Sequence, residues 1–208
     1  MKTWIRSGVA LTLLLGGCIS STPPAEFFTL TPEIAESERG SVGVAVDTIG
    51  VGPIDLPRYL LRPQMVSRAE GNRLVIDEFA RWGDSLDLQL GRTVTQNLTD
   101  LCGDTLVLPF PWRTDFEPDL RVIGDVTRFD VDDSGTVRFD IRWAVTNVAT
   151  RQALSIHDSN YEGSADPAEP SSIAAGMSGV LAQFSRDAAA ALAEGATEAQ
   201  ARSSSDGG

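Results

Sequence analysis

The sequence predicts an α+β domain in which a mostly antiparallel sheet carries two helices packed on one face. Two stretches repeat apolar residues every three or four positions, which is typical of amphipathic helices. Between them, another stretch alternates apolar and polar residues at every second position, which is typical of a half-buried strand. The 208 residues suit a single domain with a sizeable core, and we place that domain at residues 41–194.

Residues 1–17 have the features of a lipoprotein signal peptide. A basic segment with Lys2 and Arg6 precedes an apolar run over residues 9–15, and two glycines then lead to Cys18. The run is too short for a membrane span, which needs about 20 apolar residues. The order Leu-Gly-Gly-Cys resembles the bacterial lipobox, in which the cysteine is acylated and becomes the new N-terminus. The alternative is a plain secretory signal that happens to carry a cysteine.

Residues 18–40 are predicted to form the lipid anchor and a polar tether. Ile19 and Ser20 follow the cysteine, and the aspartate that commonly retains lipoproteins at the inner membrane of enteric bacteria is absent there. By resemblance to that sorting rule, we expect the protein at the outer membrane, lipid-anchored and facing the periplasm. The lipid on Cys18 would supply its contact with the membrane.

The charge balance indicates which partners to exclude. Cleavage before Cys18 removes Lys2 and Arg6 and no acidic residue, so the 17 basic residues become 15 against 29 acidic ones. Such an acidic surface repels phosphate backbones and anionic headgroups. We therefore expect no nucleic acid partner.

The first part of the domain contains strand patterns. Alternating valines over residues 42–46 predict a strand. The glycines and prolines of residues 50–57 predict a turn-rich connector, because proline cannot donate to the ladder of a central strand; whether it is an interface loop or a packed corner stays open. Residues 59–68 and 74–76 are then expected to form a hairpin around Gly71-Asn72.

Two helices follow from the apolar periodicity. The first begins after an N-cap at Asp84 or Ser85 and the second after Ser171 or Ser172. Beyond Glu194 the periodicity stops, so residues 195–208 are predicted to be a disordered tail. The apolar stripes are Leu86, Leu90, Val94, Leu98 and Leu101 on the first helix, and Ile173, Met177, Val180, Leu181, Phe184, Ala188 and Leu192 on the second.

The remaining strands lie between these helices. Residues 106–110 form a short apolar strand, and residues 120–131 form a longer one. The clearest alternation covers residues 137–145, after a turn at residues 132–135. A last strand through Leu154 and Ile156 would complete a meander.

No group of residues has the pattern of an active site or a metal site, so we expect no enzyme, catalytic residue, metal or cofactor. The single histidine, His157, lies beside Ser155 and Asp158, but neighbours along a strand point to opposite faces and do not assemble a triad. We interpret it as a solvent-facing strand residue. With Cys18 acylated, Cys102 has no intrachain partner and is interpreted as a buried apolar residue.

One segment carries a family resemblance. Tyr59 to Arg68, read as YLLRPQMVSR, is followed by Asn72, Leu74, Asp77, Glu78, Trp82 and Leu86. This pattern resembles the PqiC-like ABC-type transport auxiliary lipoproteins, and Phe28-Thr29-Leu30 stands where that family usually shows Tyr-x-Leu. Phe28 in place of Tyr, and Ser85 in place of the common Pro, depart from the family pattern.

The resemblance implies a fold and a role. The fold would be similar to the N-terminal domain of TolB. The role would be that of an accessory to an MCE-domain protein, which forms a tunnel for lipid between the two membranes. The protein would dock the far end of that tunnel, and it could also bind its own copies as a homo-oligomer.

Four residues of the motif are candidates for partner binding: Tyr59, Arg62, Arg68 and Trp82. Arg and Trp are typical interface anchors. The alternative is structural, with an arginine paired to Asp77 or Glu78 and Trp82 filling the gap between helix and sheet.

Two other functions stay open. A carrier would hold a phospholipid acyl chain in a cavity of several hundred Å³. Residues as large as Phe139, Trp143 and Phe184 are instead expected to fill the core. An envelope-stabilising lipoprotein that binds peptidoglycan or Tol components is the third hypothesis.

Overall fold

The computed structural model describes residues 23–112 and 117–205 of the chain. The predicted signal peptide and Cys18 therefore lie outside the described residues. The fold is α+β, with two α-helices and an eight-stranded sheet. The elements, in chain order, are β1 (Glu26–Phe28), η1 (Glu36–Glu38), β2 (Thr48–Asp55), η2 (Arg58–Leu60), β3 (Gln64–Ala69), β4 (Arg73–Trp82), α1 (Leu86–Cys102), β5 (Leu106–Pro109), β6 (Leu120–Asp132), β7 (Thr136–Asn147), β8 (Gln152–Ser164) and α2 (Pro170–Ser205).

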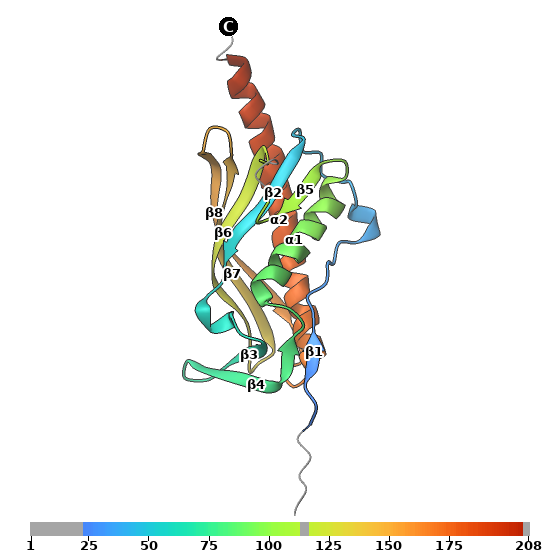
Figure 1. Cartoon of the computed structure of the whole chain (residues 1–208), viewed down its shortest axis with the longest axis vertical. Coiled ribbons are helices and arrows are strands. Elements are labelled where there is room, and N and C mark those ends of the chain that lie inside the picture. Colours follow the sequence, from blue (N-terminus) through green and yellow to red (C-terminus); the bar gives the residue numbers. More distant parts are fainter. Residues whose placement is uncertain (1–22, 113–116, 206–208) are drawn as a thin grey trace, which may run out of the picture.

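Strand β6 is the centre of the sheet. Along one edge it pairs with β7, and β7 pairs with β8, in the two longest antiparallel ladders. Along its other edge β6 pairs in parallel with β2 at one end and with β3 at the other. Two short arms follow, β2–β5 and β3–β4–β1, and they lie toward opposite ends of the long axis (Figure 1).

The core lies between the sheet and the two helices, which contact each other. All five residues of the predicted stripe on α1 and all seven on α2 are buried, and so are the alternating apolar residues of β7. Phe184 of α2 packs against Phe139 and Trp143, with ring centroids 5.6 and 5.4 Å apart. The predicted helices, the β3–β4 hairpin and strand β7 are thus confirmed, although α2 begins at Pro170, before the predicted caps at Ser171 or Ser172.

The folded part begins earlier than residue 41, because residues 26–38 pack against the helices. Strand β1 pairs with the end of β4, and Leu30 and Ile34 join the core. The backbone N–H groups of Leu30 and Glu33 donate to Gln89 Oε1 and Asn97 Oδ1 at 2.9 and 3.0 Å. Side chains of α1 therefore satisfy the backbone of this segment, a pairing that local sequence does not reveal.

The strand predicted at residues 42–46 is wrong, and the predicted connector at residues 50–57 is largely strand β2. Ile49 and Val51 are buried, and β2 pairs in parallel with both β5 and β6. A Cβ on Gly50 would lie 2.7 Å from Pro118 Cγ and 2.9 Å from Trp112 Cζ3. Glycine is thus needed in this strand for close packing, although the same residue type suggested a turn.

Helix α2 continues to Ser205, where the sequence predicted a disordered tail from residue 195. Ala196 is fully buried, and Gln200 Nε2 donates to the backbone oxygen of Ala45 at 2.9 Å. Small residues leave no apolar stripe for a periodicity search, yet they let the helix pack closely. Neither helix in the described residues combines the length and hydropathy of a membrane-crossing segment.

Candidate functional site

The four predicted site residues lie in two places. Tyr59 and Arg68 meet at Asp130 of β6, whereas Arg62 and Trp82 line a groove beside the start of α1. The motif is continuous in sequence, but the chain turns between η2 and β3, so neighbouring motif residues have different surroundings.

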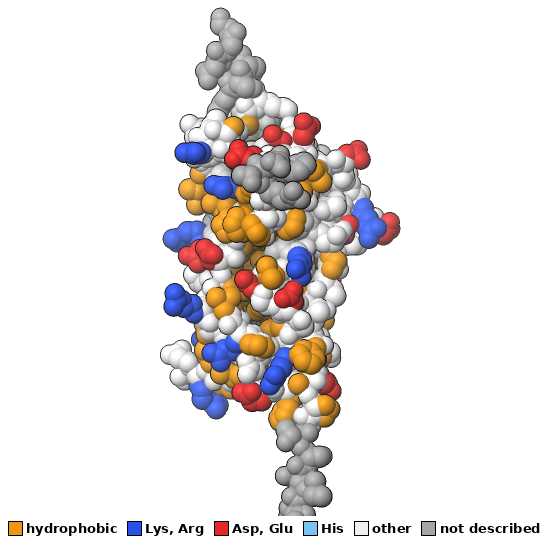
Figure 2. Space-filling view, viewed as in Figure 1, with side chains coloured by type: hydrophobic (Ala, Val, Ile, Leu, Met, Phe, Trp, Pro, Cys, Tyr) orange, Lys and Arg blue, Asp and Glu red, His pale blue; other side chains and the backbone are white. Residues whose placement is uncertain are grey.

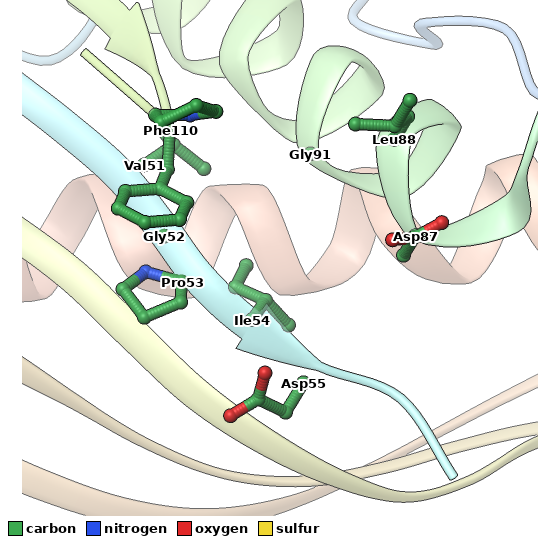
Figure 3. A pocket seen from close by; sticks show the side chains of 10 residues that line it. Val51, Gly52, Pro53, Ile54, Asp55, Asp87, Leu88, Gly91 and Phe110 are labelled. Atoms are coloured by element: carbon green, nitrogen blue, oxygen red, sulfur yellow. The ribbon is translucent and has the colours of Figure 1, made fainter. Parts of the chain in front are cut away.

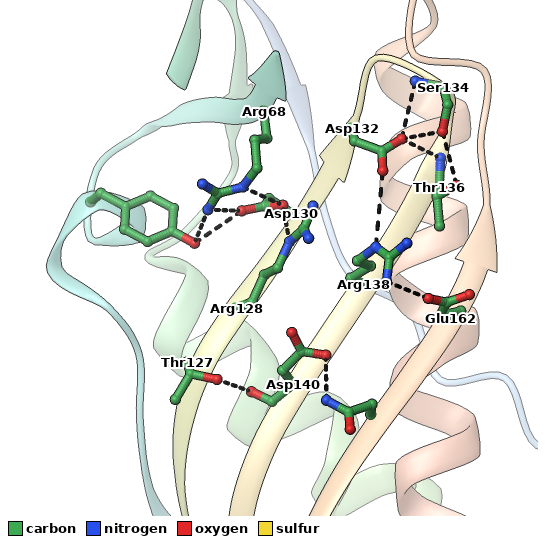
Figure 4. Close-up of polar contacts among 12 residues, drawn as sticks. Arg68, Thr127, Arg128, Asp130, Asp132, Ser134, Thr136, Arg138, Asp140 and Glu162 are labelled. Atoms are coloured by element: carbon green, nitrogen blue, oxygen red, sulfur yellow. Dashed lines mark hydrogen bonds and ion pairs between the residues drawn. The ribbon is translucent and has the colours of Figure 1, made fainter. Parts of the chain in front are cut away.

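Asp130 holds the first group together. Its side chain is fully buried and accepts hydrogen bonds from Tyr59 Oη at 3.0 Å, Arg68 Nη2 at 2.8 Å and Arg128 Nε at 2.8 Å (Figure 4). Burial, followed by the charge of Asp130, raises the pKa of Tyr59 to about 12, so the hydroxyl stays a neutral donor. The cluster joins η2, β3 and β6.

The structural alternative therefore holds for Arg68, but with a partner that the sequence did not indicate. Asp77, one of the expected partners, accepts the backbone N–H groups of Phe79 and Ala80 instead. Glu78 accepts from Gln64 Nε2. The sequence did not indicate Asp130 as the acceptor, because Tyr59 and Arg68 lie more than sixty residues away from it along the chain.

The second group lines a groove of about 490 Å³, which we call the Arg62–Trp82 groove. Trp82 lines it but is only 5% exposed, whereas Leu61 is 51% exposed. The backbone N–H of Trp82 donates to Pro63 O at 2.7 Å, which fixes the end of β4 beside η2. Trp82 is thus almost fully buried, as expected for a residue that fills the gap between hairpin and helix. The lining residues are Leu61, Arg62, Pro63, Trp82, Asp84, Ser85 and Asp87.

Arg62 has an unsatisfied group in this groove. Its Nε is buried and has no hydrogen-bond partner among the residues that the structure describes. The nearby Asp84 is already engaged, since its Oδ2 lies 2.8 Å from Arg92 Nη1 and its Oδ1 accepts from the N–H of Ser85. A buried donor without a partner is costly, which sets Arg62 apart from the other residues that line the groove.

A smaller hollow of about 210 Å³ lies between β2 and α1. Figure 3 shows Pro53 and Ile54 on one wall and Leu88 on the other, with the ring of Phe110 beside them. Asp87 is the residue that lines both hollows. The segment at residues 50–57, which the sequence predicted to be a connector, is therefore largely a packed strand whose last residues line a surface hollow.

Three exposed residues of this surface were missed by sequence reasoning: Asp87, Leu88 and Phe110. Leu88 and Phe110 are 41% and 48% exposed. Leu88 is an apolar residue outside the buried stripe of α1, and that position in the sequence could have indicated an exposed apolar residue. Figure 2 shows hydrophobic side chains along this face of the molecule, with charged side chains between them.

The structure places the remaining candidate side chains in packing roles. His157 is half-buried and stacks on Trp143 with centroids 4.2 Å apart, rather than facing solvent as expected. Asp158 is engaged by Arg142 at 2.8 Å. Cys102 is buried, and burial raises the pKa of its thiol to about 11. No group of three metal-ligating side chains gathers within the described ranges.

Comparison with known families gives a match over residues 28–189 to the ABC-type transport auxiliary lipoprotein component. The chain belongs to this family. The match contains the whole motif from Tyr59 to Trp82, so the resemblance seen in the sequence is confirmed.

Solved structures share the fold of this auxiliary lipoprotein. One is protein XCC0632 from Xanthomonas campestris, of family DUF330, with 14% identity and a TM-score of 0.66, covering 84% of this chain and 99% of that one. Another, described as an uncharacterized protein, has 19% identity and a TM-score of 0.65, covering 80% of this chain and 97% of that one. No curated protein matches the sequence.

Proposed function

We propose that this lipoprotein is the outer-membrane accessory of an MCE-type lipid transport system and docks the tunnel-forming MCE protein through the Arg62–Trp82 groove. The observation that carries the docking site is the buried Nε of Arg62, which has no hydrogen-bond partner among the described residues and belongs to a side chain that lines an open, partly apolar groove. The family match supports the role in ABC-type transport.

The groove offers two kinds of contact to a partner protein. Leu61 and Pro63, both exposed, provide apolar area, and Arg62 provides a charged donor whose partner in the complex would be a carboxylate or a backbone carbonyl. Arg and Trp are the residue types that most often dominate binding energy at interfaces. A partner segment with one apolar side chain beside an acceptor would satisfy both.

The proposal includes a lipid on Cys18 after removal of residues 1–17, and an address at the outer membrane facing the periplasm. Strand β1, which follows the tether, lies at one end of the long axis (Figure 1). The anchor would therefore join the membrane to the end of the molecule that also carries β3 and β4.

The proposed role needs no catalysis, cofactor or nucleic acid. The net charge of −12 disfavours a phosphate backbone as partner. A carrier role has less support, because the rings of Phe139, Trp143 and Phe184 fill the space between the sheet and α2.

The test is purification of the full-length protein from its native membrane in mild detergent, followed by mass spectrometry of what accompanies it. We expect an MCE-domain protein, with recovery at least about tenfold lower for Arg62→Glu and for Leu61→Ser. Both side chains are at least partly exposed, so these variants should keep the fold. The matched control is Arg151→Glu at the exposed β7–β8 turn.

Three outcomes would contradict docking at this groove. One is equal recovery of the MCE protein with Arg62→Glu and Arg151→Glu. Another is stoichiometric phospholipid without any protein, which would support the carrier. Recovery of Tol components or peptidoglycan fragments instead would support the envelope-stabilising role.

A further inference from the structure

The outer part of β4 has a free edge. Residues 73–77 pair with β3 on one side, whereas β1 pairs on the other side only with Ala80–Trp82. The second edge of residues 73–77 therefore has no strand beside it within residues 23–112 and 117–205. Backbone N–H and C=O groups along such an edge are available for another strand.

This free edge is also apolar. Leu74, Val75 and Ile76 are 36%, 41% and 40% exposed, in a strand where consecutive side chains point to opposite faces. Proteins usually protect an edge with a charge, a proline or a covering segment. The centre of this one has none of these among the described residues.

The chain's own tether is unsuited to cover the edge. Glu26 pairs in parallel with Ala80, so extending that register would place Pro24 beside Glu78 and Pro23 beside Asp77. Proline has no N–H to donate to a ladder. These two prolines therefore interrupt the pairing of β1 just where the apolar part of the edge begins.

The sequence of the edge is complementary to itself. It reads Arg73-Leu74-Val75-Ile76-Asp77, and Arg73 has no ion pair among the described residues. If two copies align antiparallel around Val75, Arg73 of each copy faces Asp77 of the other, and Leu74 faces Ile76. Opposite charges and apolar pairs directly across a ladder are both stabilising.

We propose that the free edge of β4 pairs with β4 of a second copy, as a two-fold antiparallel interface centred on Val75. The interface joins the sheets of the two copies and does not use the Arg62–Trp82 groove. It is therefore independent of the docking proposed above.

The proposal predicts one short distance. At the two-fold axis the two Val75 side chains face each other, with Cβ atoms about 4.5–5.5 Å apart. That spacing is close to what a disulfide requires. Full-length Val75→Cys, oxidised with copper phenanthroline in its native membrane, should run as a dimer on a non-reducing gel.

The matched control is Arg73→Cys on the same face of the same strand, where the two copies of the residue are four positions apart across the ladder. We expect at least about tenfold more cross-linked dimer from Val75→Cys than from Arg73→Cys. Adding Arg73→Glu to Val75→Cys should reduce the dimer, since it places two like charges opposite each other, and Arg151→Glu should not. The wild type, with only Cys18 and Cys102, sets the baseline.

Equal cross-linking of Val75→Cys and Arg73→Cys, or none with either, would overturn the proposal. Folding is checked by circular dichroism of each purified variant. A measurement that needs no cysteine is the mass of the wild type in detergent by analytical ultracentrifugation. A dimer that Ile76→Lys converts to a monomer supports the edge pairing, and a wild-type monomer contradicts it.

Discussion

At the scale of single residues, Asp130 is the one charged residue that is buried among those the structure describes. Its fully buried carboxylate receives hydrogen bonds from two arginines and a tyrosine. We expect Asp130→Ala to lower the free energy of unfolding by about 2–3 kcal/mol, because the donors lose their acceptor and two cations come together. Urea denaturation followed by circular dichroism measures the change.

A surface ion pair is the control for this prediction. Arg142 and Asp158 form a contact of the same length, 2.8 Å, but both side chains are mostly exposed. Asp158→Ala should therefore cost less than about 1 kcal/mol. If the two variants are equally stable, Asp130 does not have the structural role assigned to it.

Glu38 makes the stability depend on pH. Hydrogen bonds from Arg186 lower the pKa of Glu38 from 4.5 to about 2. A lowered carboxylate pKa stabilises the fold above the unfolded value, and that contribution is lost as the pH falls from 4.5 toward 2. As the pH is lowered through this range, the free energy of unfolding, measured by urea titration, should therefore fall less for Glu38→Gln than for the wild type.

At the scale of elements, glycine has opposite roles in β2 and α1. Gly50→Ala should destabilise the protein by about 1–3 kcal/mol, because the new methyl group would overlap Pro118 and Trp112. Gly91→Ala in α1 should instead stabilise it by about 0.5–1 kcal/mol, since a Cβ there meets nothing within 4 Å. Thermal unfolding of both variants tests the pair, and a shift of the same sign in both would contradict the packing described for β2.

The last turns of α2 are expected to contribute to stability. Deleting residues 195–208 removes the buried Ala196 and the hydrogen bond from Gln200 to Ala45. We expect a loss of about 1–2 kcal/mol, whereas deleting only residues 206–208 should have no measurable effect. Equal stability of the two truncated proteins, measured in urea, would show that the segment behaves as the tail expected from sequence.

The elements that could be predicted are those with local periodicity. The helix stripes, the hairpin and β7 follow from the spacing of apolar residues, which depends only on the local chain. Strand β2 could not be predicted in this way, because Gly50, Gly52 and Pro53 indicate a turn until parallel neighbours are known. The end of α2 was missed because alanine and glycine pack without an apolar stripe.

The candidate site was predictable to a similar extent. The family motif contained Arg62 and Trp82, and these two do lie together. No feature of the local sequence distinguished them from Tyr59 and Arg68. Those two residues donate hydrogen bonds to Asp130, which lies more than sixty residues away in sequence. Leu88 and Phe110 come from different elements, so only the folded chain brings them to one surface.

At the scale of the whole molecule, one hydrophobic core joins both arms of the sheet to both helices. We therefore expect a single cooperative unfolding transition. Tryptophan fluorescence reports on Trp82 in the β3–β4–β1 arm, on Trp112 beside Gly50 of the β2–β5 arm and on Trp143 in β7, and far-ultraviolet circular dichroism reports mainly on the helices. The two curves in urea should coincide, and separate midpoints would show that one arm unfolds alone.

The length of α2 sets how far the protein can reach from a membrane. Its 36 residues extend for about 54 Å at about 1.5 Å per residue. Its N-terminal part contacts β1, while its C-terminal end lies at the opposite end of the long axis (Figure 1). If Cys18 carries the anchor, one end of this rigid rod stays near the lipid surface. If α2 also lies along the membrane normal, its other end would stand farther from the lipid than the thickness of a bilayer core, which is about 30 Å.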